Sequence, residues 1–151
     1  MILDNKQDEN ILVKKTKIKR LKIFKTTFAL LGISGAIGLF FLAFYIVLVY
    51  QTFSEFTSIA ELTATIFVLS SLTIISALVI IFGSLTIIKG GWKGGVINIL
   101  VGTIIPIPTY IYFAFFSQLK LYTDWLVPVG PFILILPIIS GGMSLILLKF
   151  E

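Results

Sequence analysis

Residues 27–50, TFALLGISGAIGLFFLAFYIVLVY, decide the fold of this chain. The stretch holds 24 residues and carries no charged side chain. At 1.5 Å per residue an α-helix of this length reaches about 36 Å, which exceeds the hydrocarbon core of a bilayer at about 30 Å. A single segment in lipid satisfies its backbone hydrogen bonds only as a helix. The stretch therefore predicts a transmembrane helix.

Three further apolar stretches follow, over residues 62–88, 96–117 and 126–148. The whole chain of 151 residues is 58% hydrophobic and 13% charged, whereas an average soluble domain is about 45–50% apolar and about 25% charged. A water-soluble fold of this size could not cover so much apolar surface. We predict an all-α integral membrane protein: a basic segment over residues 1–26, then a four-helix transmembrane bundle over residues 27–151.

Cations crowd into the segment before the first span. Eight of the twelve Lys and Arg lie before residue 26, seven of them close together: Lys14, Lys15, Lys17, Lys19, Arg20, Lys22 and Lys25. Because an apolar span follows, the cluster predicts contact with anionic lipid headgroups and not with nucleic acid. Ile18, Leu21 and Phe28 fall roughly on one helical face, which predicts a short interfacial helix. Residues 4–10 are polar and predict a disordered terminus.

The distribution of charge predicts the orientation. Under a four-span arrangement, eleven of the twelve cations fall on the side of the N-terminus. Cytoplasmic loops carry the excess of Lys and Arg, so both termini are expected in the cytoplasm. The layout resembles small prokaryotic four-helix membrane proteins in topology alone, which implies the plasma membrane of a prokaryote.

Aromatic and basic residues mark the expected membrane surfaces. The sequence KGGWKGG at residues 89–95 predicts a tight turn between the second and third spans. Trp92, Lys93 and Trp125 are expected at the level of the headgroups, where Trp is enriched and where Lys extends its charged end.

Small residues recur at helical spacing and predict close helix packing. The set comprises Gly32, Gly35 and Ala36 in the first span, Gly94, Asn98 and Gly102 in the third, and Gly141 in the fourth. The helix that approaches them could belong to this chain or to another one.

Prolines interrupt the last two spans. Pro106 and Pro108 lie in the middle of the third span and Pro137 lies inside the fourth. Each removes a backbone donor and clashes with the preceding turn, so we expect kinks there. Broken helices of this kind also form binding sites in transporters.

No residue pattern supplies chemistry. The chain has no Cys and no His, which excludes disulfides, thiolate metal sites and His-based acid–base catalysis. The four spans contain no ionisable side chain, although such groups mark most proton-coupled and voltage-sensing sites. We therefore expect no catalytic residue, no cofactor and no metal, and expect that the protein is not an enzyme.

Two functions remain. The first is a non-catalytic structural or accessory subunit of a larger membrane complex, with lipids, other membrane subunits or further copies of itself as partners. The second is a small self-associating transporter or channel, lined by the kinked third helix and by Thr73, Ser76 and Ser84 of the second. These hydroxyls could instead bond between helices or back to their own backbone. Similar endings of the second and fourth spans, SLTIIK and SLILLK, leave a duplication of two hairpins open.

Overall fold

The computed structural model describes residues 2–53, 60–116 and 126–150, and every regular element in these ranges is a helix. The helices are α1 (Ile2–Phe53), α2 (Ala60–Ile88), α3 (Trp92–Ile104), α4 (Pro106–Ile111), the π-helix η2 (Tyr112–Phe116), α6 (Leu126–Leu147) and the 3-10 helix η3 (Leu148–Phe150). Four stretches are long and apolar enough to cross a membrane: Ile11–Thr52, Thr63–Ile88, Trp92–Ala114 and Val127–Leu147. The prediction of an all-helical chain with four such stretches is confirmed.

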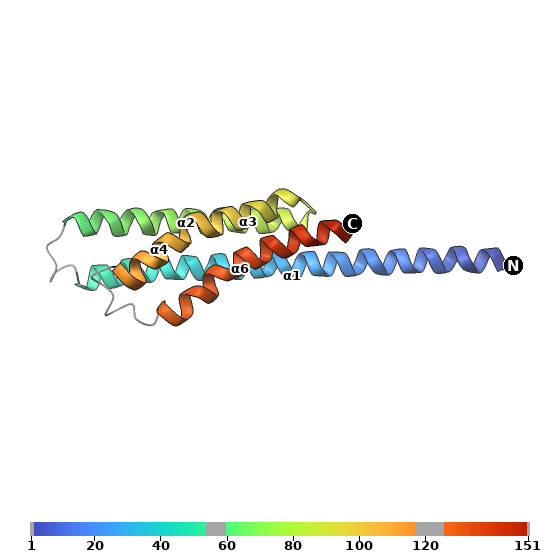
Figure 1. Ribbon diagram of the computed structural model, residues 1–151, viewed down its shortest axis with the longest axis horizontal. Helices are drawn as coiled ribbons and strands as arrows, with labels where there is room; N and C mark the ends of the chain where they lie inside the picture. Colours follow the sequence, from blue (N-terminus) through green and yellow to red (C-terminus); the bar gives the residue numbers. More distant parts are fainter. Residues whose placement is uncertain (1, 54–59, 117–125, 151) are drawn as a thin grey trace.

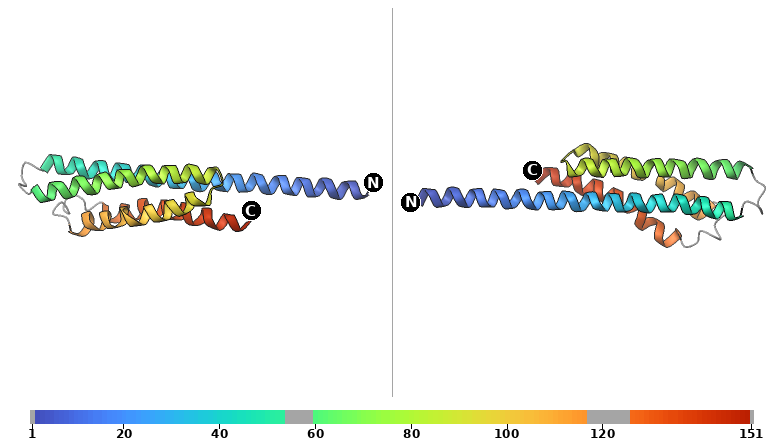
Figure 2. Two further views of the ribbon diagram at one scale, coloured as in Figure 1. Left: turned by 90° about the horizontal axis from the view of Figure 1, so that it is seen from above. Right: turned by 180° about the vertical axis from the view of Figure 1, so that it is seen from behind.

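The four long stretches form one antiparallel bundle (Figure 1). Helix α1 packs along α2 and α6, and α3 packs along the same two helices, so α1 and α3 occupy opposite corners. The views in Figure 2 show the same arrangement from above and from behind. The α2–α3 turn and the end of α6 lie at the end of the bundle from which α1 extends (Figure 1).

Helix α1 differs from its prediction. The basic segment and the first span form one unbroken helix of 52 residues, about 78 Å long at 1.5 Å per residue. The backbone of residues 4–10 belongs to this helix, where a disordered or frayed terminus was expected, and the expected interfacial helix continues into the first span without a break. The physical reason is visible in the sequence, because no Gly or Pro occurs before Gly32, so nothing ends or bends the helix. Its first part projects beyond the other helices (Figure 1).

The inner half of α1 is buried along a regular stripe. Its buried positions recur after three and then four residues: Ala29, Gly32, Ala36, Leu39, Ala43, Ile46 and Tyr50. This is the spacing at which one face of a helix meets its neighbours. Four of these seven positions carry Gly or Ala, which lets the neighbouring helices approach closely.

The connection between α2 and α3 is shorter than the predicted turn over residues 89–95. Gly90 has φ +85, a left-handed conformation that Gly adopts without a Cβ penalty. Its N–H donates to the Ile87 carbonyl at 2.9 Å, and the Gly91 N–H donates to the Thr86 carbonyl at 3.0 Å. These two bonds make the Schellman ending of α2. Helix α3 then begins at Trp92, so the second glycine pair belongs to a helix.

The third span changes its helical geometry at the predicted prolines. Helix α3 ends at Ile104 and α4 begins at Pro106. Thr109 bonds to the Ile105 carbonyl through its N–H at 3.1 Å and its hydroxyl at 2.9 Å. Helix α6 continues through Pro131 and Pro137. A bend of the helix axis at any of these prolines stays a prediction.

Candidate functional site

Helices α2, α3 and α6 approach one another backbone to backbone at four glycines, Gly83, Gly94, Gly95 and Gly141. A Cβ on Gly94 of α3 would overlap the carbonyl oxygen of Gly83 in α2. A Cβ on Gly141 of α6 would overlap the carbonyl oxygen of Gly95, the next residue of α3. Consecutive glycines thus let α3 touch the backbone of both neighbours. Such contacts are typical of helices that associate in lipid, where packing replaces the hydrophobic effect.

A buried polar cluster lies beside these contacts. The Asn98 side chain in α3 donates from Nδ2 to Ser84 Oγ in α2 at 3.0 Å and to Ser140 Oγ in α6 at 3.3 Å. All three side chains are 0% exposed. Asn98 lies six positions after Trp92, which places the cluster about 9 Å along the axis of α3 from its first residue. One amide therefore joins three helices by side-chain hydrogen bonds.

Helix α1 closes the cluster with Gly32. A Cβ at this position would overlap Ser84 Oγ and would lie 2.7 Å from Ser140 Oγ and 2.9 Å from Asn98 Nδ2. The missing side chain of Gly32 is what leaves room for the polar groups. The cluster accordingly brings together one residue from each of the four spans.

The second polar atom of Asn98 lies against a glycine backbone. Asn98 Oδ1 is buried without a hydrogen-bond partner among the described residues, and a Cβ on Gly83 would overlap it. The oxygen therefore faces the Cα of Gly83, where a weak Cα–H···O contact is available. This contact explains how the amide oxygen is accommodated in a packed interior.

The other two hydroxyls on the α2 face donate hydrogen bonds to carbonyls of α2 itself. Thr73 Oγ1 donates to the Leu69 carbonyl and Ser76 Oγ donates to the Leu72 carbonyl, both at 2.8 Å. Both side chains are 1% exposed. This bond back to the preceding turn is common for Ser and Thr in apolar helices. Of the three α2 hydroxyls considered above, Ser84 alone takes part in the cluster.

The remaining small residues lie on the same inner faces. A Cβ on Gly35 would come within 2.8 Å of Pro137 Cγ, and a Cβ on Gly102 would come within 3.2 Å of Pro137 Cβ. Ala36 is fully buried. Pro106 is buried and Pro108 is exposed. Pro137 is thus held between α1 and α3.

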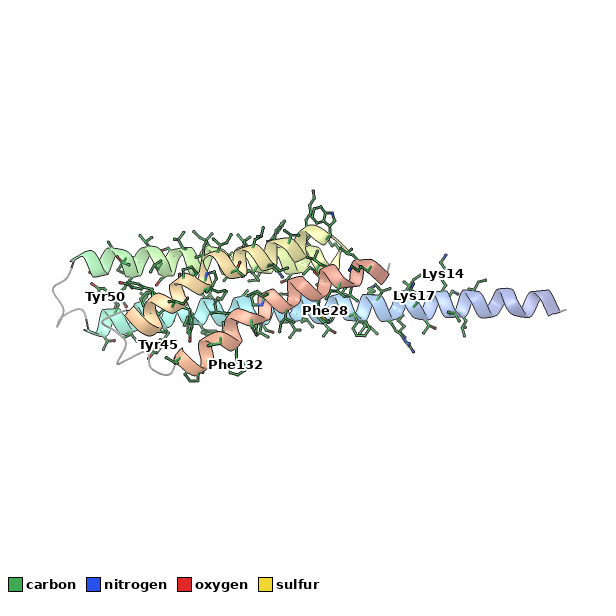
Figure 3. The ribbon with its side chains drawn as sticks, in the orientation of Figure 1. Lys14, Lys17, Phe28, Tyr45, Tyr50 and Phe132 are labelled. Carbon is green, nitrogen blue, oxygen red and sulfur yellow. The ribbon has the colours of Figure 1, made fainter. Side chains whose placement is uncertain are left out.

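The basic side chains that the structure describes lie at the end of the bundle marked by the α2–α3 turn and on the projecting part of α1, where Figure 3 labels Lys14 and Lys17. Six basic side chains among the described residues of α1 are exposed: Lys14, Lys15, Lys17, Lys19, Arg20 and Lys22. Lys25 is half-buried. Trp92, at 56% exposed, and Lys93 begin α3 at this end. Trp125 lies outside the described residues.

Two surface grooves flank the projecting part of α1. The first, of about 450 Å³, lies between α1 and the end of α2. The second, of about 600 Å³, lies toward α6 and is mainly apolar; Leu12, Val13, Thr16, Lys17, Arg20, Leu21, Phe24 and Leu147 line it. The projecting part of α1 thus presents one basic groove and one apolar groove.

Sequence reasoning missed three members of the central contact: Gly83, Gly95 and Ser140. A signal was present, because Gly83-Ser84 and Ser140-Gly141 are small, polar pairs near the ends of the second and fourth spans. Ser144, which begins SLILLK as Ser84 begins SLTIIK, instead donates to the Gly141 carbonyl at 2.7 Å. Ser84 and Ser144 therefore have different partners.

The arrangement is one of packing. Among the described residues, no three His, Cys, Asp or Glu side chains come together as a metal site would require. The central polar atoms bond to one another across α2, α3 and α6, and Gly32 of α1 packs against them. Comparison with known proteins gives no match, either to a protein-family model, to a curated protein or to a solved structure.

Proposed function

We propose that this protein is a non-catalytic structural or accessory subunit of a larger membrane complex. The observation that carries the proposal is the difference between the two halves of α1. The inner half, from residue 29 on, packs in the bundle, whereas the outer half, up to residue 28, leads into the part that projects from the bundle. Leu12, Val13 and Phe24 on the outer half are 69%, 63% and 50% exposed. Apolar side chains grouped along a groove are typical of a surface that another protein covers.

The apolar groove beside α6 is the proposed contact with another subunit. Leu12, Val13 and Phe24 occupy one side and Leu147 of α6 the other. Helix-in-groove binding uses anchors of this kind, in which apolar side chains of one helix fill the groove of another. Lys17 and Arg20 at the same groove favour a partner helix with acidic residues.

The membrane arrangement that we propose follows the distribution of charge. The α2–α3 turn and the end of α6 share one end of the bundle with the outer half of α1 (Figure 1). Lys89 lies in this turn, Lys93 in the first turn of α3, and Lys149 in η3, directly after α6. The positive-inside rule favours the cytoplasm for this end, so both termini are cytoplasmic in the proposed orientation. The topological resemblance to small prokaryotic four-helix proteins supports the plasma membrane of a prokaryote. Kinks at Pro106, Pro108 and Pro137 would fit the last two spans to their neighbours.

The experiment is purification of the tagged full-length protein from its own membranes in mild detergent, followed by native mass spectrometry. We expect a defined companion subunit at constant stoichiometry. The double substitution Leu12→Gln and Phe24→Gln, inside the apolar groove, should release it. The matched control, Ile11→Gln and Ile23→Gln, changes exposed apolar residues outside that groove and should retain it. A lone monomer, or equal loss with both variants, would contradict the proposal.

A self-associating transporter or channel is the second candidate. The observation that favours it is a pair of buried polar atoms, Ser70 Oγ and Asn98 Oδ1, that have no hydrogen-bond partner within the described part of the chain. In this candidate α2 and α3 line a path between copies. Liposome flux that disappears after Thr73→Leu, Ser76→Leu or Asn98→Leu would support the transporter, whereas liposomes that pass no ion or small solute would exclude it.

A further inference from the structure

We propose that the groove between the outer half of α1 and the end of α2 is a binding site for the phosphate-bearing headgroup of an anionic phospholipid. The proposal rests on the membrane orientation given above. It does not depend on the accessory role, because a lipid can occupy this groove with or without a partner subunit.

The lining of the groove comes from two helices and a turn. The residues are Lys14, Lys17, Ile18, Leu21, Lys22, Lys25, Ile88, Lys89 and Gly90. The six that belong to α1 follow one another at intervals of three, one, three, one and three residues. This spacing places them on one face of the helix. The face is turned toward the end of α2, so its lysines point into a space already bounded by Ile88 and Gly90.

The charge of the groove favours an anion. Five lysines line it, and none of the described residues that line it is acidic. A Cβ on Gly90 would lie 3.3 Å from Lys25 Nζ, so the half-buried Lys25 side chain reaches from α1 to the turn. Like charges held together repel, and a phosphate among them would offset this repulsion and accept their hydrogen bonds.

The position of the groove favours a lipid over a soluble anion. The headgroup layer adds about 5–8 Å to each side of the hydrocarbon core. Lys25 and Lys22 stand two and five residues outside the apolar span that starts at residue 27, or about 3–8 Å along the helix axis. Lys89 follows the last residue of α2. These three cations therefore lie at the depth of lipid phosphates.

Apolar surface continues from the groove toward the middle of the span. Ile88 is 40% exposed and Leu85 47% exposed on the last turns of α2. An acyl chain attached to a headgroup in the groove would pass along this surface. A headgroup among lysines with its chain on apolar side chains satisfies both ends of a phospholipid.

The test is lipid binding by the purified full-length protein, measured by native mass spectrometry with phosphatidylglycerol and with phosphatidylcholine. The groove variant combines Lys14→Gln, Lys22→Gln, Lys25→Gln and Lys89→Gln, which leaves Lys17, a residue that lines both grooves, unchanged. The matched control combines Lys15→Gln, Lys19→Gln, Lys93→Gln and Lys149→Gln, which removes the same charge from the same end of the molecule. A third variant keeps Lys25 and carries the other three groove substitutions, so that a folding defect at this half-buried position cannot imitate loss of binding.

The wild-type chain should prefer phosphatidylglycerol over phosphatidylcholine by at least about tenfold, as expected for several lysines at an anionic surface. Both groove variants should lose most of this preference, and the control should keep it within about twofold. Equal loss in the groove and control variants would overturn the proposal, because the effect would then be diffuse charge. Soluble glycerol phosphate that displaces the lipid at comparable concentration would overturn it in favour of a soluble anion.

The outcome is separable from the accessory role. Retention of a companion subunit by the groove variant, together with loss of lipid preference, would support the lipid site and leave the apolar groove as the protein contact. If the apolar-groove variant loses the companion subunit and keeps its lipid preference, the result would also show that the subunit and the lipid bind to different grooves.

Discussion

The two halves of α1 share one unbroken helix and differ in what surrounds them. Residues 29–50 bury a regular stripe, whereas residues 11–20 are exposed at every position. The outer half up to residue 28 contains no Gly and no Ala, and the inner half contains six, at positions 29, 32, 35, 36, 38 and 43. Apolar side chains occur in both halves, so hydrophobicity alone does not decide which half packs.

This difference indicates that small residues specify the packed half. In lipid, an exposed Leu loses little relative to a buried one, because the acyl chains are equally apolar. Close contact between backbones, which small residues such as Gly and Ala permit, supplies the dispersion energy that holds the helices together. Substitutions that change the packed half of α1 or its contacts should destabilise the bundle under this explanation, whereas a substitution in the outer half should not.

The largest effect is expected from Gly32→Leu. The new side chain would displace Ser84, Ser140 and Asn98 together, which adds overpacking to the loss of the polar cluster. We expect the free energy of unfolding in mixed detergent micelles to fall by about 3 kcal/mol. Ser34→Leu, an exposed position two residues further along the same helix, is the control and should change it by less than about 0.5 kcal/mol.

A smaller effect is expected from Gly141→Ala, compared with Gly142→Ala. A Cβ on Gly141 would overlap the Gly95 carbonyl, whereas a Cβ on Gly142 meets nothing within 4 Å. The first substitution should lower the free energy of unfolding by about 2 kcal/mol, because α3 and α6 must separate. The second should leave it unchanged or raise it by up to about 1 kcal/mol through the better helix propensity of Ala. Equal effects at the two neighbouring positions would show that this contact does not hold the helices.

Asn98→Leu should lower the free energy of unfolding by about 1 kcal/mol, since interhelical hydrogen bonds in membranes contribute about 0.6 kcal/mol each. A double substitution can assign part of this loss to one hydrogen bond of the cluster. Combining Asn98→Leu with Ser140→Ala should cost less than the sum of the two single changes, because each removes the same bond. Strictly additive effects would contradict the hydrogen bond between these side chains.

The smallest effect is expected in the outer half of α1. Leu12→Ala removes an apolar side chain that is 69% exposed and should change the free energy of unfolding of the isolated chain by less than about 0.5 kcal/mol. A loss comparable to that of Gly141→Ala would show that the outer half packs against the bundle and would remove the contrast between the halves.

The sequence predicts the helical class and the four apolar stretches well, because a bilayer permits few alternatives to a helix of about 20 residues. It predicts the end of α2 equally well, since Lys89-Gly90-Gly91 matches the residues that a Schellman ending requires. The role of Gly94 and Gly95 could not be predicted from the neighbouring sequence. A glycine pair after a Trp looks like part of the turn, and only the approach of α2 and α6 gives it a packing role inside α3.

The polar cluster was predicted in part for the same reason. Asn98 stands out as the most polar residue of its span, and the small stripe from Gly94 to Gly102 marks its face. Ser140 does not stand out, because a serine in an apolar helix has the carbonyl of the preceding turn as a ready partner. Which serine bonds across helices depends on how the helices cross, and this crossing is a property of the whole bundle.

The most direct test of the account is the membrane side reached by each end of α1. The chain contains no Cys, so single substitutions to Cys can be labelled without background. We expect Lys15→Cys and Lys149→Cys to react with an impermeant maleimide from the cytoplasmic side, and Thr52→Cys to react from the opposite side. Labelling of Lys15→Cys and Thr52→Cys from the same side would contradict a helix that crosses the membrane once and continues into the cytoplasm.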